Sequence, residues 1–254
     1  MKILVCGKGG SGKSVVTTLL AGELASRGFK VLVVDMDESN FGLHRQLGLE
    51  LPKSLTEYLG GRRELSQKIF KASGEEEVLS QVFRGGWKVE SLPAECLSHR
   101  GNITLLAVGK IRRFEEGCAC PMGALARSLL ERLELGEREV ILVDSDAGIE
   151  HFGRGVEGAC SLILVVVDPT YESLRLSTSI LKMAGEAGKP AYLILNRVNS
   201  RIMDTLMKGL DKSRILGVVP EREEIFQACL EGSEIRLNLK EVSELVDRLL
   251  SLKP

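Results

Sequence analysis

Apolar residues gather in short runs along this chain, and longer segments between the runs carry apolar positions at every third or fourth residue. The runs cover residues 3–6, 31–34, 103–108, 140–143, 162–167, 192–195 and 215–219. Most runs are continuous rather than alternating, which is typical of parallel strands that helices cover on both faces. The pattern therefore predicts seven strands of a buried sheet.

Helical spacing fills much of the chain between these runs. It is clearest at residues 15–26, 124–135, 174–187 and 242–252. This alternation favours an α/β fold, with a doubly wound, mostly parallel sheet and helices on both faces. Residues 51–100 interrupt it with two Gly-Gly pairs and three consecutive glutamates, so we expect helices and loops inserted there. We expect residues 1–254 to form a single domain.

The composition argues against several classes of protein: nucleic-acid-binding, membrane-spanning and secreted. The chain has 34 Lys and Arg against 35 Asp and Glu, and its net charge of −1 lacks the basic excess that nucleic-acid binding requires. Its longest apolar run, residues 161–167, is too short to cross a bilayer. Glycines and lysines follow the first apolar residues directly, unlike the apolar stretch of a signal peptide. We expect a cytoplasmic protein without nucleic-acid or membrane partners.

A phosphate-binding motif follows the first predicted strand. Residues 7–14 read GKGGSGKS, which fits G-x-x-x-x-G-K-[ST] ahead of a helix. Glycines let backbone N–H groups surround phosphate oxygens, Lys13 would neutralise the β- and γ-phosphates, and Ser14 would bind Mg²⁺. The motif predicts ATP or ADP with Mg²⁺, held by Lys8, Gly9, Gly10, Ser11, Gly12, Lys13, Ser14 and the amide of Val15.

The same glycines also satisfy a dinucleotide-binding fingerprint. Gly7, Gly9 and Gly12 fit G-x-G-x-x-G, and Asp35 ends the next strand where a ribose-binding acid would lie. A dinucleotide loop has no need of the Lys13-Ser14 pair, and the strand at residues 140–143 ends in an acid suited to Mg²⁺. These features favour a nucleoside triphosphate, with a dinucleotide-binding oxidoreductase as the alternative.

A second lysine, Lys8, stands directly before Gly9 and Gly10. The loop thereby resembles the family with the deviant Walker A motif KGGxGK[ST], which includes MinD, ParA, the arsenite-pump ATPase and the nitrogenase iron protein. In that family the early lysine reaches across a two-fold interface to the nucleotide of the partner chain. The resemblance implies an ATP-hydrolysing homodimer with Lys8 and Lys13 in the catalytic site. Alternatively, Lys8 contacts its own nucleotide or only solvent.

The resemblance extends to both switch segments. Residues 31–37 resemble the second strand and first switch of the family, in which Asp37 would orient the attacking water and Asp35 would support the loop. Residues 144–148 resemble the second switch, in which Asp144 would act on Mg²⁺ through water. A water-positioning carboxylate suits phosphoryl transfer, where positioning and electrostatics supply most of the rate. For Asp35, a turn residue at a strand end is the alternative.

Two further segments resemble those that bind the adenine base in this family. Residues 195–197 resemble the adenine-reading turn, which contains Asn196 and Arg197, and an Asn amide can both donate and accept hydrogen bonds. Residues 217–221, with Pro220, resemble the segment whose backbone lies along the base. Both segments could equally be ordinary turns at strand ends.

Cys118 and Cys120 lie one residue apart just before a predicted helix. Thiols at this spacing seldom form a disulfide with each other, and a helix N-terminus lowers a thiol pKa and favours the metal-binding thiolate. Two ligands make a weak site, but a two-fold dimer supplies four thiolates, which suit Zn²⁺ or Ni²⁺. The alternative is two reduced cysteines at a helix start.

Residues 117–121 and 147–155 resemble motifs of the CooC-type ATPases, the nickel-handling maturation factors of carbon monoxide dehydrogenase. The resemblance implies Ni²⁺ as cargo, with Zn²⁺ as a possible occupant of the same site. It also implies apo carbon monoxide dehydrogenase or a related nickel enzyme as partner. His151 is a candidate extra ligand or a structural residue. A MinD/ParA-like switch with another cargo is the alternative function.

A shared iron–sulfur cluster is a further alternative, since the nitrogenase iron protein bridges its dimer with cysteines. That protein draws one cysteine from each of two segments per chain. Here residues 144–148 contain no thiol, which argues against a cluster of that kind. A cluster on the four paired thiolates stays open.

Overall fold

The computed structural model describes residues 1–69, 74–83, 86–110, 120–148 and 155–252. Within these ranges eight strands form one sheet in the spatial order β3-β4-β2-β5-β1-β6-β7-β8. All neighbouring strands are parallel except β3, which runs antiparallel to β4. The predicted fold class is confirmed, and each of the seven predicted runs lies on a strand. The strands are β1 (Lys2–Gly7), β2 (Lys30–Asp35), β3 (Leu97–Arg100), β4 (Ile103–Ala107), β5 (Glu139–Asp144), β6 (Leu162–Val167), β7 (Ala191–Val198) and β8 (Ile215–Pro220).

Strand β3 is the one that the apolar pattern did not predict. Its sequence, LSHR, contains a single apolar residue, and its last two residues are exposed. β3 lies at the edge of the sheet, where it pairs antiparallel with β4 across a short turn at Gly101. An edge strand needs no continuous apolar run, because helices do not cover both of its faces.

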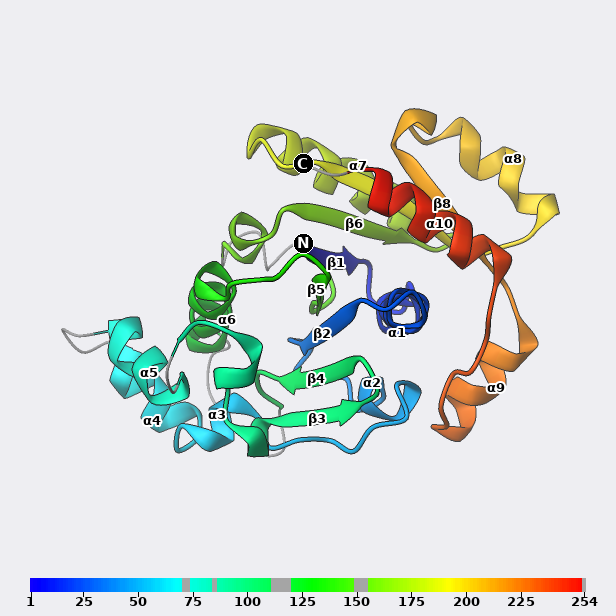
Figure 1. Cartoon of the computed structure of the whole chain (residues 1–254). Helices are drawn as coiled ribbons and strands as arrows, with labels where there is room; N and C mark the ends of the chain where they lie inside the picture. The colour runs from blue at the N-terminus through cyan, green and yellow to red at the C-terminus, as the bar shows by residue number, and fades with distance from the viewer. Residues whose placement is uncertain (70–73, 84–85, 111–119, 149–154, 253–254) are drawn as a thin grey trace.

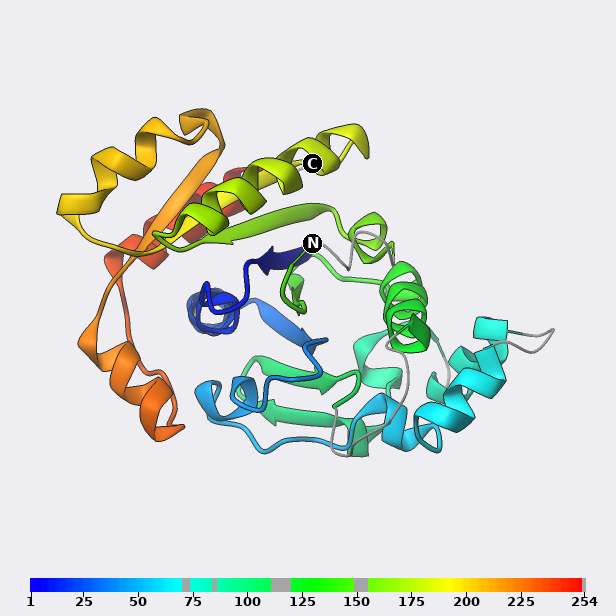
Figure 2. The ribbon, with the colours of Figure 1, turned by 180° about the vertical axis from the view of Figure 1, so that it is seen from behind.

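Helices cover both faces of the sheet, as Figures 1 and 2 show from opposite sides. Helices α1, α2, α9 and α10 share one apolar core with the sheet, and α3 to α8 share the other. Alternate residues of one strand divide between the cores, as Leu4 and Val5 of β1 do. The helices are α1 (Lys13–Ser26), α2 (Leu43–Gln46), α3 (Leu55–Tyr58), α4 (Arg62–Ile69), α5 (Gly74–Val82), α6 (Cys120–Arg132), α7 (Tyr171–Glu186), α8 (Ser200–Lys208), α9 (Glu223–Glu231) and α10 (Lys240–Ser251).

All four helices that the apolar spacing predicted begin earlier than expected. The observed starts lie two to four residues before the predicted ones, at Lys13 in α1, Cys120 in α6, Tyr171 in α7 and Lys240 in α10. Apolar periodicity marks the buried face of a helix, whereas a first turn is often polar and is defined by its cap. Thr170 caps α7 in this way by accepting a hydrogen bond from the Ser173 amide. Cys120 is therefore the first residue of a helix and does not precede it.

Helices α3, α4 and α5 and strand β3 lie between β2 and β4 in the chain, within residues 51–100. Ser54 starts α3 with a capping box, in which its Oγ accepts from the Glu57 amide and the Glu57 carboxylate accepts from the Ser54 amide. Leu65 of α4 and Leu79 of α5 belong to the same core as α6. The segment therefore packs beside α6. Across the part of the chain that the structure describes, no helix combines the length and apolar character needed to cross a membrane.

Candidate functional site: a phosphate-binding loop and its carboxylates

The loop between β1 and α1 has a main-chain path that requires glycine. Gly12 is left-handed at φ 93°, and a Cβ there would lie 2.1 Å from Nδ2 of Asn196. Gly10 is also left-handed, at φ 80°, and Ser11 donates its amide to the carbonyl oxygen of Lys8 at 3.1 Å. Glycine adopts such angles without the strain of a side chain. The path turns this loop around the N-terminus of α1, where backbone N–H groups bind anions.

Lys13 opens α1 with a buried side chain. Its residue is 6% exposed, and its ammonium makes no hydrogen bond or ion pair to any other residue that the structure describes. A buried charge without a partner is unfavourable, so buried lysines in folded proteins are normally paired. The predicted β- and γ-phosphates would supply that missing anion at the N-terminus of α1.

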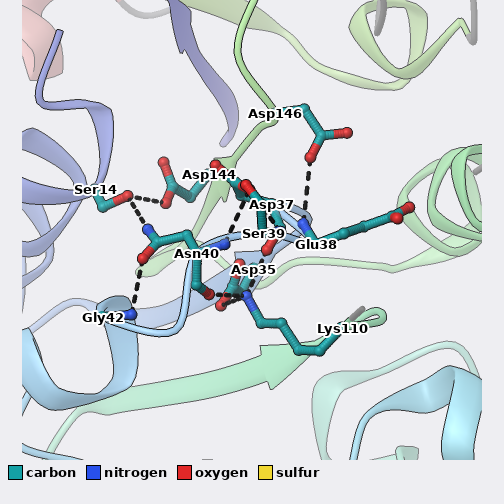
Figure 3. Close-up of polar contacts among 10 residues, drawn as sticks. All are labelled: Ser14, Asp35, Asp37, Glu38, Ser39, Asn40, Gly42, Lys110, Asp144 and Asp146. Carbon is teal, nitrogen blue, oxygen red and sulfur yellow. Dashed lines mark hydrogen bonds and ion pairs between the residues drawn. The ribbon is translucent and has the colours of Figure 1, made fainter. Parts of the chain in front are cut away.

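Ser14 and Asp144 meet at the carboxyl end of β5 (Figure 3). The Ser14 hydroxyl donates to Oδ2 of Asp144 at 2.6 Å, and the side-chain amide of Asn40 donates to the Ser14 Oγ at 2.6 Å. Asp144 is fully buried, and this burial raises its pKa to about 6, although Ser14 and Lys13 lower it in part. A hydroxyl oxygen beside a carboxylate is the donor set that Mg²⁺ prefers, and the cation would offset the buried charge. The two residues therefore fit the predicted Mg²⁺ site.

Asp35, at the end of β2, forms a buried ion pair that sequence reasoning missed. Its Oδ2 lies 2.6 Å from Nζ of Lys110, and both side chains are at most 2% exposed. Burial raises the pKa of Asp35 to about 7, and the Lys110 charge opposes that shift. The Lys110 ammonium also donates to the carbonyl oxygens of Asp37 and Asn40. A lone lysine just after a buried strand was the available signal, and it matches no motif.

Asp37 begins the loop between β2 and α2 and stabilises it locally. Its Oδ1 accepts hydrogen bonds from the amides of Ser39 and Asn40, at 3.0 and 3.1 Å, and from the Ser39 hydroxyl. Such Asx turns are common where a chain reverses after a strand. In this structure the Asp37 carboxylate is engaged in its own loop, and the loop lies beside Asp144 (Figure 3).

The next residue of this loop, Glu38, ties it to two other segments. The Glu38 amide donates to Oδ1 of Asp146 at 3.3 Å, and its carboxylate pairs with Nη2 of Arg62 at 2.6 Å. Arg62 is the first residue of α4, and both side chains of the pair are about one-tenth exposed. The loop after β2 therefore contacts the second predicted switch and the helices between β2 and β4. Sequence reasoning did not identify either Glu38 or Arg62.

Lys8 lies close to an acid of its own chain. Its Nζ is 3.9 Å from Oδ2 of Asp168, just beyond the end of β6, and its side chain is 31% exposed. Thr170 donates its hydroxyl to Oδ1 of the same carboxylate at 3.1 Å. The sequence predicted a phosphate of either chain, or solvent, as the partner of Lys8, and no motif pointed to Asp168. The available signal was an acid directly after the buried run of residues 162–167.

The predicted adenine-contact residues lie against the phosphate loop. Asn196 is 3% exposed in β7, and its Nδ2 donates to the Ser11 carbonyl oxygen at 2.7 Å. Arg197 is left-handed at φ 56°, and its Nη1 donates to the Gly10 carbonyl oxygen at 3.0 Å. Pro220 is the last residue of β8. All three lie in strands rather than in turns, and their contact with adenine stays a prediction.

The predicted cargo site falls mostly outside the described residues, which include neither Cys118 nor His151 nor the thiol of Cys120. Cys6, Cys96 and Cys160 are free and buried, and burial raises the pKa of each thiol to about 11 or 12. Thiols with such pKa values remain protonated and are poor metal ligands. In the ranges that the structure describes, no cluster of three or more metal-ligating side chains occurs.

Comparisons with known proteins point to nucleotide binding, as the phosphate-binding loop does. A family model described as the CobQ/CobB/MinD/ParA nucleotide binding domain matches residues 2–235. An uncharacterized ATP-binding protein of Methanocaldococcus jannaschii is 49% identical over 249 residues, covering 98% of this chain and 99% of that protein. The carbon monoxide dehydrogenase accessory protein CooC of Rhodospirillum rubrum is 32% identical over 223 residues, covering 87% of this chain and 83% of that protein.

Solved structures show the same fold at lower identity. The septum site-determining protein MinD of Pyrococcus horikoshii OT3, complexed with Mg-ADP, matches with a TM-score of 0.69 and 21% identity, covering 99% of this chain and 97% of that one. A ParA family ATPase of Chlorobium tepidum TLS matches with a TM-score of 0.61 and 22% identity, covering 98% and 99%.

Proposed function

This chain belongs to the CobQ/CobB/MinD/ParA family of nucleotide-binding domains, and from that membership we propose that it works as an ATP-hydrolysing homodimer that carries nickel. In this proposal Cys118 and Cys120 of both protomers bind the ion. The client is apo carbon monoxide dehydrogenase or a related nickel enzyme. The 32% identity to an accessory protein of carbon monoxide dehydrogenase supports that client.

The observation that carries the ATPase proposal is the buried Lys13, which has no hydrogen-bond or ion-pair partner among the described residues, beside the Ser14–Asp144 pair. The loop amides and Lys13 hold the phosphates, and Ser14 with Asp144 holds Mg²⁺, which neutralises phosphate charge when bound. Asp37 orients the attacking water, for which its carboxylate has a second oxygen besides the Oδ1 that accepts from the amides of Ser39 and Asn40. Most of the rate comes from positioning and electrostatics, because phosphoryl transfer needs little covalent help.

The homodimer gives Lys8 its role. In the proposed closed dimer, Lys8 exchanges Asp168 for a phosphate of the nucleotide in the partner chain. The contact with Asp168 is long, at 3.9 Å, and partly exposed, so its loss costs little. Phe41, after β2, and Tyr171, after β6, are 43% and 73% exposed, and large exposed apolar side chains of this kind suit an interface.

The cargo proposal combines sequence with helix geometry. Cys120 is the first residue of α6, and a helix N-terminus stabilises a thiolate. Two such pairs across a two-fold axis give the four sulfur ligands that Ni²⁺ or Zn²⁺ accepts. Closure by ATP would then change the metal affinity, because one dimer geometry serves both sites. We place this activity in the cytoplasm, where thiols stay reduced.

The ATPase proposal is tested by steady-state hydrolysis of MgATP. We expect Lys13→Ala to abolish nucleotide binding, and Lys8→Ala to keep binding while losing dimer closure and hydrolysis. Lys189→Ala is the matched control, because Lys189 donates to the carbonyl oxygens of Gly158 and Cys160, away from the loop. Normal hydrolysis by Lys8→Ala would show that the second lysine has no role across the dimer.

The cargo proposal is tested by an anaerobic nickel titration of the reduced protein, read by metal analysis and size exclusion. We expect one nickel per two chains, with dimerisation, and loss of both in Cys118→Ala/Cys120→Ala. Absence of binding in the wild type would leave an ATPase switch with another cargo. A thermal-shift panel of nucleotides addresses the oxidoreductase alternative, which requires nicotinamide dinucleotide binding without Mg²⁺.

A further inference from the structure

We propose that Gly109 and Lys110 form a mechanical link between the nucleotide site and the first turn of α6, which begins at Cys120. Lys110 holds the loop of residues 36–42, and Gly109 packs against the first turn of α6. The role of Lys110 in positioning this loop for hydrolysis rests on the described contacts alone. The consequence for metal affinity rests on the proposed function, because it requires nickel at Cys118 and Cys120.

The ammonium group of Lys110 has an acceptor for each of its protons. Its ammonium contacts the Asp35 carboxylate and donates to the carbonyl oxygens of Asp37 and Asn40. An ammonium has three protons, so these three acceptors use its full capacity. The Lys110 side chain is 2% exposed, which leaves it little room for another conformation. A movement of the loop carbonyls therefore displaces Lys110.

Asn40 connects the acceptors of the Lys110 ammonium to the predicted Mg²⁺ site. The Asn40 side chain donates to the Ser14 hydroxyl at 2.6 Å, while its carbonyl oxygen accepts from Lys110. Ser14 in turn donates to Asp144 at 2.6 Å. Mg²⁺ bound to the Ser14 oxygen would repel the Asn40 Nδ2–H group that donates to the same oxygen, because both the cation and the N–H hydrogen are positive. The loop of residues 36–42 consequently senses the occupancy of the nucleotide site.

Gly109 carries the other end of the link to α6. A Cβ at Gly109 would lie 2.3 Å from Sδ of Met122, so the Gly109 main chain packs directly on that side chain. Met122 is 3% exposed and lies two residues after Cys120 in α6. Met36 and Glu38 of the loop line one small cavity together with Gly109, Met122 and Gly123. The loop and the first turn of α6 therefore border the same small cavity, and Gly109 contacts Met122 there.

Val108, the residue before Gly109, is fixed by hydrogen bonds of its main chain. Val108 donates its amide to the Asp35 carbonyl oxygen at 3.0 Å, and its own carbonyl oxygen accepts from the amide and hydroxyl of Thr56 in α3. These hydrogen bonds fix the main chain at the end of β4. We therefore expect any movement of the loop of residues 36–42 to be transmitted to Gly109 and Lys110, the two residues that follow. Lys110 directly precedes residues 111–119, which contain Cys118, and Cys120 follows them. One flank, Lys110, thus contacts the loop of residues 36–42, and the other flank, the first turn of α6, contacts Gly109.

The test compares the wild type with Lys110→Met, Lys110→Arg and the double variant Asp35→Asn/Lys110→Met. The double variant removes both buried charges, so it remains informative if Lys110→Met alone folds poorly. Lys189→Met is the control, because Lys189 also donates to two main-chain carbonyls. For each protein, kcat and KM for MgATP are measured, followed by nickel dissociation constants with ADP and with a slowly hydrolysed ATP analogue.

We expect kcat of Lys110→Met and of the double variant to fall on the order of 100-fold through misplacement of the Asp37 loop, with KM changed far less. The nickel affinities of the wild type should differ between the two nucleotide states by about 5- to 150-fold. That ratio should fall to about one in both variants. Lys110→Arg should recover part of kcat, and Lys189→Met should match the wild type. A wild-type ratio and kcat in the double variant would overturn the proposal.

Hydrogen exchange of the α6 amides separates this proposal from the cargo proposal. We expect exchange in the first turn of α6 to depend on the bound nucleotide in the wild type and to lose that dependence in the Lys110 variants. A wild type that binds no nickel but keeps this dependence would refute the cargo and support the link. Exchange in α6 that ignores the nucleotide in the wild type would refute the link, whatever nickel does.

Discussion

The loop of residues 7–14 and the loop of residues 36–42 face each other across Asp144, and different kinds of contact hold them. The first follows a main-chain path that depends on glycines, with Gly10 and Gly12 left-handed. The second depends on long side chains from other segments: Lys110 after β4 and Arg62 in α4. Asn196 and Arg197 of β7 also donate to the first loop, so the contrast lies in its glycine-dependent main-chain path, and we expect the loop without such a path to switch more readily.

The buried lysines at the two loops, Lys13 and Lys110, differ in their contacts. Lys13 is 6% exposed and makes no ion pair or hydrogen bond to another described residue, while Lys110 is 7% exposed and has three acceptors. Burying an ammonium without partners costs free energy that only a ligand returns. We therefore predict that Lys13 binds an anion from outside the chain, whereas Lys110 pairs with groups of the fold itself. The substitutions below separate these roles, beginning with the largest expected effect.

Lys110→Met should destabilise the protein by about 3–5 kcal/mol at pH 8, because it leaves the buried Asp35 carboxylate without its cation. At pH 5 the loss should be smaller, since the pKa of Asp35 is raised to about 7 and the carboxyl can stay neutral there. Urea unfolding at both pH values measures this. Asp35→Asn/Lys110→Met should recover most of the loss. Equal stability of Lys110→Met and wild type at pH 8 would contradict the comparison.

Lys13→Met should weaken MgATP binding by about 100-fold or more, equivalent to about 3 kcal/mol, because the phosphates lose a charged hydrogen-bond donor. The same substitution should leave the nucleotide-free protein as stable as the wild type or more stable, because it removes an unpaired buried charge. Titration calorimetry and urea unfolding give the two values. A large loss of stability without nucleotide would show that Lys13 has a structural partner.

Asp144→Asn should flatten the pH dependence of stability in the nucleotide-free protein. Burial raises the pKa of Asp144 from 3.8 to about 6, so the folded state holds a proton that the unfolded state releases. The associated stability, about 3 kcal/mol, is fully present below pH 4 and is lost as the pH rises through 6. Unfolding free energies at pH 4 and pH 7 test this. An unchanged slope in the variant would assign the dependence to other groups.

Gly12→Ala and Gly10→Ala should have the smallest effects on stability, and they form the most closely matched pair of substitutions. Both glycines are left-handed, so each substitution should cost about 1 kcal/mol through backbone strain. A Cβ at Gly12 would also meet Asn196 and disturb its bond to Ser11, whereas a Cβ at Gly10 meets no atom within 4 Å. Gly12→Ala should therefore lose about 2–3 kcal/mol in total. Thermal unfolding of the two variants would refute this reading if they were equally stable.

Sequence patterns predicted the sheet and the phosphate loop because both depend on neighbouring residues. Continuous apolar runs marked seven strands, and only the edge strand β3, with a single apolar residue, escaped this pattern. The motif placed Lys13 and Ser14 at a helix start, where the structure has them. Asp35 and Asp144 were identified as acids at strand ends, but no local pattern indicated what would neutralise Asp35.

The sequence by itself determined the fold class, the phosphate motif and the set of acids around it, since periodicity and short motifs are local properties of the chain. Only the tertiary structure decided which charges meet. Lys110 reaches Asp35 because β4 and β2 are neighbours in the sheet, and Asp168 lies near Lys8 because β6 pairs with β1. Such contacts depend on strand order, which is a property of the whole fold.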